Sequence, residues 1–311
     1  MANLIKPGDY DSLTTYLNSK IKNNTAHTKQ KYLVILHGPP SSGKAHATKV
    51  ACRLIYEYFE KTVPLSDLKN TFLNTNVDSL TYDTLTMNNI SVKQALIDNL
   101  YTTIGATYKL DYKNEIDVNL VESNIDKLVK TSYEIYQAYR PDNVSEIMFY
   151  LSVFLGLNIF LETSNGDPAY LSRVVESLKF YGYIPIIIYP FVADVSVIYH
   201  RSIKRGMMEG RFICKDTIAK SMVKCLDNYH ALVEIISKHD QYAYYQYDAN
   251  YPDCDVFLRE VLDINNPNFF RDNLLDIGVK NNINANDKMV GSNIINMKIK
   301  NYDQMTQLQI N

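Results

Sequence analysis

One stretch, residues 31–61, constrains the fold of this chain more than any other. It opens with a short apolar run from Tyr32 to Leu36, passes through the loop GPPSSGK (Gly38 to Lys44), and enters an apolar-periodic segment at Ala45. The order strand, glycine loop, helix predicts a loop whose backbone N–H groups, together with the helix N-terminus, bind a phosphate chain. A Gly/Pro turn that only joins a strand to a helix is the alternative interpretation.

The residues expected to bind nucleotide follow from this pattern. Lys44 is placed to reach the β- and γ-phosphates, while Ala45 stands where a Ser or Thr hydroxyl normally holds Mg2+. Ser42 in the loop and Thr48 one helical turn further are other sources of a hydroxyl near the metal. The expected nucleotide site consists of Gly38, Pro39, Pro40, Ser41, Ser42, Gly43, Lys44, Ala45 and His46.

The composition limits the kinds of molecule that this protein is expected to bind. The 311 residues could form one large α/β domain or two smaller ones, and 46% hydrophobic with 21% charged residues is typical of globular proteins. A net charge of −2 provides no overall field that attracts nucleic acid or an anionic membrane. We therefore expect a small-molecule partner rather than nucleic acid or a membrane, and the sequence indicates no particular protein partner.

The cysteines and the N-terminus bear on the compartment. The four cysteines are Cys52, Cys214, Cys225 and Cys254. They form no C-x-x-C pair and match no zinc spacing, which predicts free thiols in a reducing compartment. Residues 1–9 contain no apolar signal-peptide core, and the longest apolar run, residues 147–161, is interrupted by polar residues and a glycine. An intracellular, cytoplasmic protein is therefore expected.

Apolar strands and amphipathic helices alternate along most of the chain. Strands are expected at residues 32–36, 73–77, 158–162, 184–189 and 242–247, and helices at 9–23, 45–61, 144–155, 168–181, 192–205 and 215–239, with further helical pattern between 91 and 139. This alternation predicts βαβ units and a parallel sheet flanked by helices. The carboxyl ends of its strands, and so any site, then lie at one edge.

Three regions are expected. Residues 1–29 form an N-terminal helix and linker, and residues 30–264 form the α/β domain with the glycine loop. After Ile264 the composition shifts towards asparagine and apolar residues become sparse. Residues 265–311 are therefore expected to form a tail that is partly disordered or loosely packed on the domain.

Two acidic residues follow predicted strands at the same edge as the loop. Asp78 comes after the second strand and could accept a proton from a substrate hydroxyl, with a helix-capping or turn aspartate as the alternative. Glu162 ends the third strand and could orient Mg2+, while the following Thr163 or Ser164 could bind a substrate group. A strand-end acid in an ordinary polar loop is the alternative for Glu162.

Arginines concentrate after the fourth strand. Arg201, Arg205 and Arg211 lie within eleven residues, in HRSIKRGMMEGRF, and guanidinium groups match phosphate oxygens. Gly206 and Gly210 predict a mobile segment there. Together these features predict a lid that closes over a transferring phosphoryl group, with a solvated basic helix end as the alternative.

At these residues the chain resembles the zeta-toxin family of P-loop kinases. The resemblance rests on the loop GPPSSGK, on NVD after the second strand, on LETS with the helix that opens at DPAYLSRVVESLKFYGY, and on the arginine segment ending in GRFI. It implies a P-loop kinase-type parallel sheet with strand order 2-3-1-4-5. It also implies ATP- and Mg2+-dependent phosphorylation of a small hydroxyl-bearing substrate, such as a nucleotide-sugar or a nucleotide.

The resemblance also implies roles for individual residues. Asp78 would be the general base, Lys44 and the loop would hold ATP, and Arg201 and Arg211 would stabilise the transferring phosphate. Glu162 and Thr163 would face substrate or metal, and Arg205 would contact substrate. Ala45 departs from the family pattern, and the long insertion between Asp78 and Glu162 has no counterpart in it.

Two other functional classes stay open. The first is a nucleotide-binding or interaction protein that keeps a kinase fold but has lost catalytic activity. Only Ala45 favours it. A polynucleotide 5′-hydroxyl kinase would use the same parts, but it would need a basic groove that the net charge does not indicate.

Overall fold

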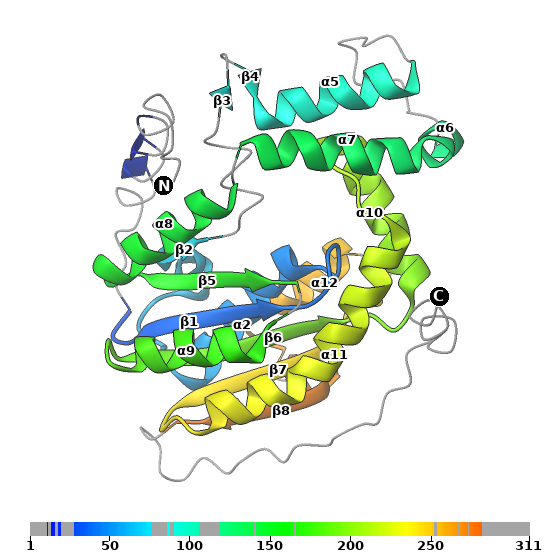
Figure 1. The fold of residues 1–311 in the computed structure, drawn as a ribbon. Coiled ribbons are helices and arrows are strands. Elements are labelled where there is room, and N and C mark those ends of the chain that lie inside the picture. Colours follow the sequence, from blue (N-terminus) through cyan, green and yellow to red (C-terminus); the bar gives the residue numbers. More distant parts are fainter. Residues whose placement is uncertain are drawn as a thin grey trace.

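The computed structural model describes a six-stranded sheet with helices on both faces (Figure 1). The described residues are 28–75, 86–87, 90–105, 118–139, 141–164, 166–251, 254–266, 268–272 and 274–281, with five helical positions between 11 and 19. Asp78, expected as a general base, lies outside the described residues.

The strand order agrees with the expected parallel topology and adds one strand. The strands are β1 (Lys31–His37), β2 (Phe72–Asn74), β5 (Asn158–Thr163), β6 (Tyr183–Phe191), β7 (Tyr242–Asp248) and β8 (Leu274–Lys280). They are arranged β2-β5-β1-β6-β7-β8, so the five parallel strands follow the order 2-3-1-4-5. The sixth strand, β8, pairs antiparallel with β7 and was not expected.

This extra strand changes the interpretation of the asparagine-rich segment. Residues 268–281, expected within a tail, contribute α13 (Phe269–Asp272) and β8 to the domain. The side chains of Phe269, Phe270, Leu275 and Ile277 are buried in the core. The few apolar residues of this segment therefore lie at positions that are buried. The average composition of the segment did not predict that it would form a strand.

Helices cover the sheet in two layers. On one face lie α2 (Lys44–Tyr58) and α12 (Cys254–Leu262), and on the other lie α9 (Pro168–Lys179) and α11 (Lys215–Ser237) (Figure 1). Two short helices, α3 (Leu65–Leu68) and the 3-10 helix η1 (Lys69–Thr71), lead into β2. Because both faces are covered, the central strands read as continuous apolar runs rather than alternating ones.

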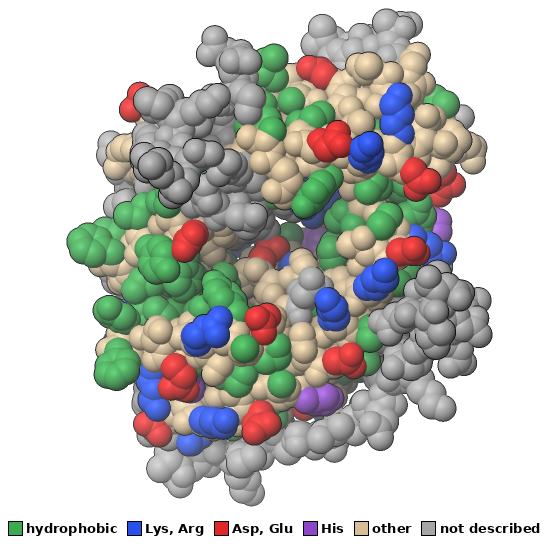
Figure 2. All heavy atoms as spheres, viewed as in Figure 1, with side chains coloured by type: hydrophobic (Ala, Val, Ile, Leu, Met, Phe, Trp, Pro, Cys, Tyr) green, Lys and Arg blue, Asp and Glu red, His purple; other side chains and the backbone are tan. Residues whose placement is uncertain are grey.

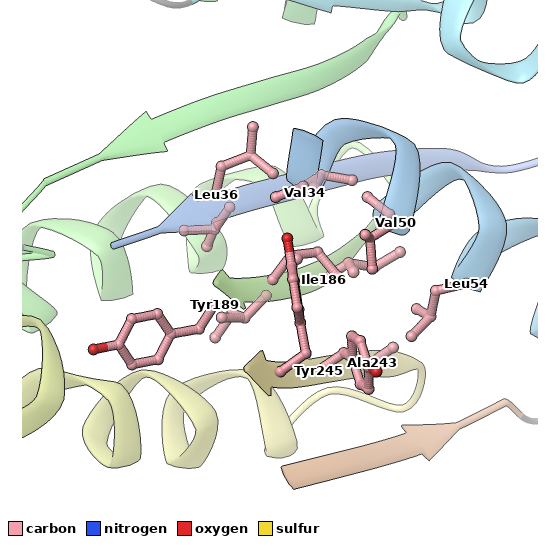
Figure 3. Packing of buried hydrophobic residues seen from close by; sticks show 14 of the residues in the cluster. Val34, Leu36, Val50, Leu54, Ile186, Tyr189, Ala243 and Tyr245 are labelled. Carbon is pink, nitrogen blue, oxygen red and sulfur yellow. The ribbon is translucent and has the colours of Figure 1, made fainter. Parts of the chain in front are cut away.

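β1 and β6, at the centre of the sheet, are its most completely buried strands. All nine residues of β6 are buried, as are Tyr32 to His37 of β1. Val34, Ile186 and Ala243 from three neighbouring strands meet Val50 and Leu54 of α2 (Figure 3). None of the helices in the described residues is long and apolar enough to cross a membrane.

The insertion between β2 and β5 forms a separate helical layer above one edge of the sheet. It contains the hairpin of β3 (Thr86–Met87) and β4 (Ile90–Ser91), followed by α5 (Val92–Ile104), α6 (Val118–Ser123), α7 (Ile125–Ala138) and α8 (Pro141–Phe154). Leu100 and Leu128 of this layer share a small core with Ile203 and Phe212, which lie after β6. The insertion thus contacts the arginine-rich region, α10 (Val195–Glu209) and the residues that follow it.

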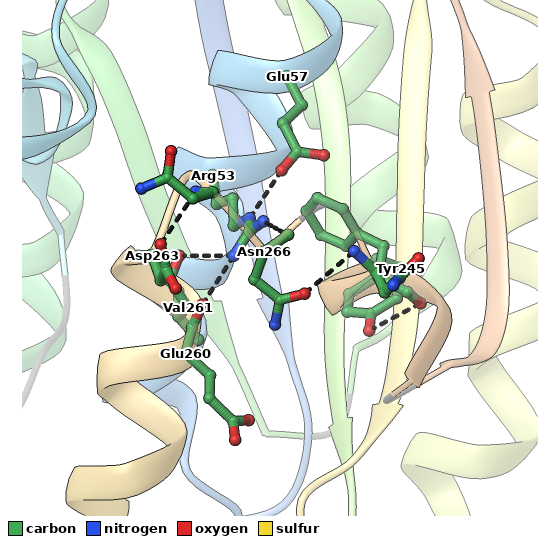
Figure 4. A network of polar contacts seen from close by, with 10 residues as sticks. Arg53, Glu57, Tyr245, Glu260, Val261, Asp263 and Asn266 are labelled. Carbon is green, nitrogen blue, oxygen red and sulfur yellow. Dashed lines mark hydrogen bonds and ion pairs between the residues drawn. The ribbon is translucent and has the colours of Figure 1, made fainter.

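A buried arginine joins α2 to the C-terminal part of the domain. The Arg53 side chain is 1% exposed, and its Nε donates to Glu57 at 2.7 Å. Its other nitrogens donate to the backbone carbonyls of Glu260, Val261 and Asn266 (Figure 4), and its guanidinium lies 4.7 Å from the Phe269 ring centroid. Arg53 thereby holds the segment between α12 and β8 against the helix that follows the glycine loop.

We expect Arg53→Met to lower the free energy of unfolding by about 3 kcal/mol, because three carbonyls and the Glu57 carboxylate lose their buried donor. Urea unfolding measures this. The matched control is Arg259→Met at an exposed position of α12, expected to change stability by less than about 0.5 kcal/mol. Equal effects of the two substitutions would contradict a clamping role for Arg53.

Candidate functional site

The glycine loop, residues 38–44, follows β1 and leads into α2 at the carboxyl edge of the sheet. Three of its residues have positive φ: Gly38 at 149°, Ser41 at 61° and Gly43 at 104°. The Gly38 N–H donates to the Thr163 carbonyl at 3.2 Å, which ties the loop to the end of β5. No acidic residue stands in the first turn of α2, so no side chain of that turn competes with an anion for its N-terminus.

Lys44 lies folded across the loop. Its side chain is 8% exposed, and Nζ donates to the carbonyls of Gly38 and Pro39 at 2.8 Å each. The Ser42 hydroxyl is fully buried and has no hydrogen-bond partner among the described residues. A buried hydroxyl and a buried ammonium beside inward-curling backbone form a donor set that suits phosphate oxygens.

Arg205 and Arg211 share a small cavity with one residue of this loop. The cavity, with room for about one water molecule, is lined by Ser41, Ser202, Arg205, Glu209, Arg211 and Ile213. Arg205 Nε pairs with Glu209 at 2.7 Å, and the Arg211 guanidinium carbon lies 3.9 Å from the ring centroid of Tyr136. One residue of the loop and two arginines therefore line the same small cavity.

Arg201 is directed elsewhere. It donates to the Ala249 carbonyl at 2.9 Å, and its guanidinium lies 5.6 Å from the Tyr251 ring. Tyr251 in turn faces His46 with ring centroids 6.4 Å apart. Arg201 and His46 thus share a neighbourhood after β7, beside the loop, while Arg205 and Arg211 line the cavity.

The two glycines of the arginine segment, residues 201–213, were expected to make it mobile, but the structure gives another reason for glycine at both positions, which is close packing. Gly206 lies within α10, and a Cβ there would be 2.5 Å from the Phe212 ring. Gly210 ends α10 with φ +76°, and a Cβ there would be 2.3 Å from the Leu96 backbone. Both glycines allow close approach, so the segment is packed against α5 and against its own chain.

Glu162 and Thr163 lie beside the loop as expected. Glu162 pairs with Leu36 in the register between β5 and β1 and is half-buried, and its side chain makes no hydrogen bond or ion pair with the described residues. The Thr163 hydroxyl accepts a hydrogen bond from the Gly166 N–H at 2.7 Å. Glu162 is therefore available to a ligand, while Thr163 already stabilises the turn after β5.

A magnesium ion would find few protein ligands here. The described residues contain no group of three or more His, Cys, Asp or Glu side chains that could hold a metal. Ala45 is exposed at the start of α2, and the Thr48 hydroxyl donates to the Ala45 carbonyl at 2.7 Å. Ser42 and Glu162 are the groups that fit Mg2+, which tolerates such a site because it retains several waters and phosphate oxygens.

His37 lies directly beneath the loop. Its Nε2 is 2.7 Å from the Cys225 carbonyl, and Nδ1 has no partner among the described residues. Burial, followed by the charge of Lys44, lowers the pKa of His37 to about 4, while the bond to the Cys225 carbonyl opposes this. His37 is thus a neutral packing residue between Tyr189 and Tyr229.

Sequence reasoning missed several residues at this edge. Glu209 could have been found, because it stands four residues after Arg205 on a helix. Tyr136 and Ser132 could not, because contact between α7 and the arginine segment joins distant parts of the chain: Phe212 N–H donates to the Ser132 hydroxyl at 3.3 Å.

Comparisons with known proteins give one relative of similar length. No protein-family model matches the chain. The uncharacterized protein L872 of Acanthamoeba polyphaga mimivirus is 36% identical over 310 residues, which are 99% of this chain and 88% of that protein. A chain from the PezAT chromosomal toxin-antitoxin system of Streptococcus pneumoniae matches with a TM-score of 0.49 and 14% identity, covering 83% of this chain and 89% of that one.

We expect His37 to make stability depend on pH. Its folded-state pKa of about 4 lies below the ordinary 6.5, so its contribution is complete above pH 6.5 and is lost as the pH falls towards 4. His37→Gln, which keeps a donor for the Cys225 carbonyl but does not titrate there, should lose about 3 kcal/mol less over this interval. Urea unfolding from pH 7 to pH 4 measures it. His200→Gln, at an exposed position, is the control; identical slopes in wild type and His37→Gln would contradict the prediction.

Proposed function

The chain belongs to the family of this mimivirus protein, and we propose that it is an ATP-dependent phosphotransferase that acts on a hydroxyl group of a small substrate, such as a nucleotide or nucleotide-sugar. One observation carries the proposal. Ser41 of the glycine loop lines a small cavity together with Arg205 and Arg211, which supports a site where the loop and two arginines act on one phosphate chain.

Such a reaction needs positioning and charge neutralisation more than covalent chemistry. The loop N–H groups, Ser42 and Lys44 would bind and orient the phosphate chain. Arg205 and Arg211 would neutralise charge that develops in the transition state. Glu209 and Tyr136 already orient these guanidinium groups, which reduces the reorganisation needed during the reaction.

The acceptor hydroxyl needs a group that takes its proton. Asp78 is proposed for this role from its place in the sequence, three residues beyond the last described residue after β2. Glu162, half-buried beside the loop, would orient the metal or the acceptor. When bound, Mg2+ would bridge the outer phosphates and reduce their charge.

The insertion supports a small acceptor. The layer of α5 and α7 stands over the carboxyl edge of the sheet, and Figure 2 shows the surface hollowed between this layer and the sheet. Tyr136 and Ser132 of α7 contact Arg211 and Phe212 of the arginine segment. An acceptor would therefore enter between α7 and the loop, where the insertion sets its size.

Purified protein incubated with γ-labelled ATP and pools of nucleosides, nucleotide-sugars and oligonucleotides tests this function. We expect label transfer to a small acceptor, reduced roughly a hundredfold in Lys44→Met, which keeps the apolar stem but loses the charge. Transfer only to oligonucleotides would favour a polynucleotide kinase. Nucleotide binding without transfer to any pool would favour a binding protein.

A nucleotide-binding protein without catalysis is the second candidate, and Ala45 favours it. The methyl group of Ala45 cannot ligate Mg2+, and the nearby Thr48 hydroxyl already donates to the Ala45 carbonyl. An enzyme with this loop would depend on phosphate oxygens, waters and a carboxylate for its metal.

Ala45→Ser separates these candidates. In an active enzyme, we expect the added hydroxyl to lower the Mg2+ concentration that gives half-maximal transfer by roughly threefold to tenfold, because it supplies one more metal ligand. A magnesium titration of transfer measures this, with Ala45→Gly as the control without a hydroxyl. If the wild-type protein is inactive at every Mg2+ concentration and Ala45→Ser restores transfer, the second candidate is supported.

A further inference from the structure

Ser41 is in a conformation that serine rarely adopts. Its φ of +61° makes it the one non-glycine residue with positive φ among the described residues. The left-handed region brings Cβ close to the following carbonyl, and residues held there are strained unless the surroundings compensate. The same loop uses glycine at its other two positive-φ positions, Gly38 and Gly43.

No side-chain hydrogen bond offsets this strain, although the Ser42 N–H donates to the Pro39 carbonyl at 3.3 Å and closes the turn that contains residue 41. The Ser41 hydroxyl makes no hydrogen bond with any described residue. Its neighbour Ser42 differs: that side chain is fully buried and fills the space beside Gly38, where a Cβ would be 2.8 Å from the Ser42 hydroxyl. Ser42 therefore packs inside the loop, while Ser41 does not.

The position of Ser41 indicates what its side chain does. It is half-buried and lines the small cavity that Arg205 and Arg211 also line. Glu209 holds Arg205, and Tyr136 supports Arg211, so both guanidinium groups have defined positions. A hydroxyl beside two guanidinium groups can be a third donor to an anion that they bind.

We propose that the Ser41 side chain donates a hydrogen bond to the outermost phosphate of a nucleoside triphosphate, and that the strained backbone at residue 41 is retained for this contact. The proposal rests on the nucleotide binding proposed above and adds to it a side chain that distinguishes the triphosphate from the diphosphate. Loop backbone groups would contact the inner phosphates in either nucleotide, whereas Ser41 lines the cavity together with the two arginines.

Two substitutions separate the hydroxyl from the strain. Ser41→Ala keeps the positive-φ requirement and loses the hydroxyl, whereas Ser41→Gly loses both. Affinities of full-length protein for ADP and for a non-hydrolysable ATP analogue, both with Mg2+, are measured by calorimetry. The unfolding midpoint is measured without nucleotide. Ser66→Ala, at an exposed position of α3, is the matched control.

Both Ser41 variants are expected to bind the ATP analogue roughly tenfold more weakly, with ADP affinity changed less than about twofold, because a hydrogen bond to a charged group is lost only with the triphosphate. Ser41→Gly should unfold roughly 2 °C above Ser41→Ala. An unchanged ratio of analogue to ADP affinity in Ser41→Ala would overturn the inference. If the wild-type protein binds neither nucleotide, the proposed function and this inference are both wrong. If it binds both nucleotides but transfers no phosphate, only the proposed phosphotransferase function is wrong.

Discussion

The parallel pairing of β1 with β5 and β6 is the constraint on which the rest of the structure depends. All nine residues of β6 and Tyr32 to His37 of β1 are buried, and β5 is buried from Asn158 to Phe160, so these three strands form the centre of the core. The pairing brings the end of β1, where the glycine loop begins, beside Glu162 and Thr163 at the end of β5. The hydrogen bond from Gly38 to the Thr163 carbonyl then fixes the start of the loop.

The second half of the site depends on long-range packing. Arg211 is supported by the ring of Tyr136, and Gly210 lies against the Leu96 backbone, so two helices of the insertion hold the arginine segment. On the other side of the sheet, Arg53 holds α12 and the residues before β8 against α2. The loop, the helix that follows it and the opposing arginines are thereby held by parts of the chain far apart in sequence.

Local patterns in the sequence were sufficient to predict the loop and the strands that flank it, because each rests on a short apolar run, whereas the order of the five parallel strands was expected from the resemblance to P-loop kinases. They were insufficient for β8, whose alternating Leu275 and Ile277 lie in an asparagine-rich background. They could not distinguish glycines needed for close packing, as Gly206 and Gly210 are in the structure, from glycines needed for mobility. The strain at Ser41 and the support of Arg211 by Tyr136 are properties of tertiary structure, and no local pattern predicts them.

The most direct test of this account is a crystal structure of the protein with Mg2+ and a non-hydrolysable ATP analogue. The account predicts the phosphate chain in the loop of residues 38–44, Lys44 moved from the Gly38 and Pro39 carbonyls to phosphate oxygens, and the outermost phosphate between Ser41 and Arg205 with Arg211. A nucleotide bound elsewhere, or a phosphate chain in the loop with Lys44 still bonded to those carbonyls and both arginines distant from it, would contradict the account.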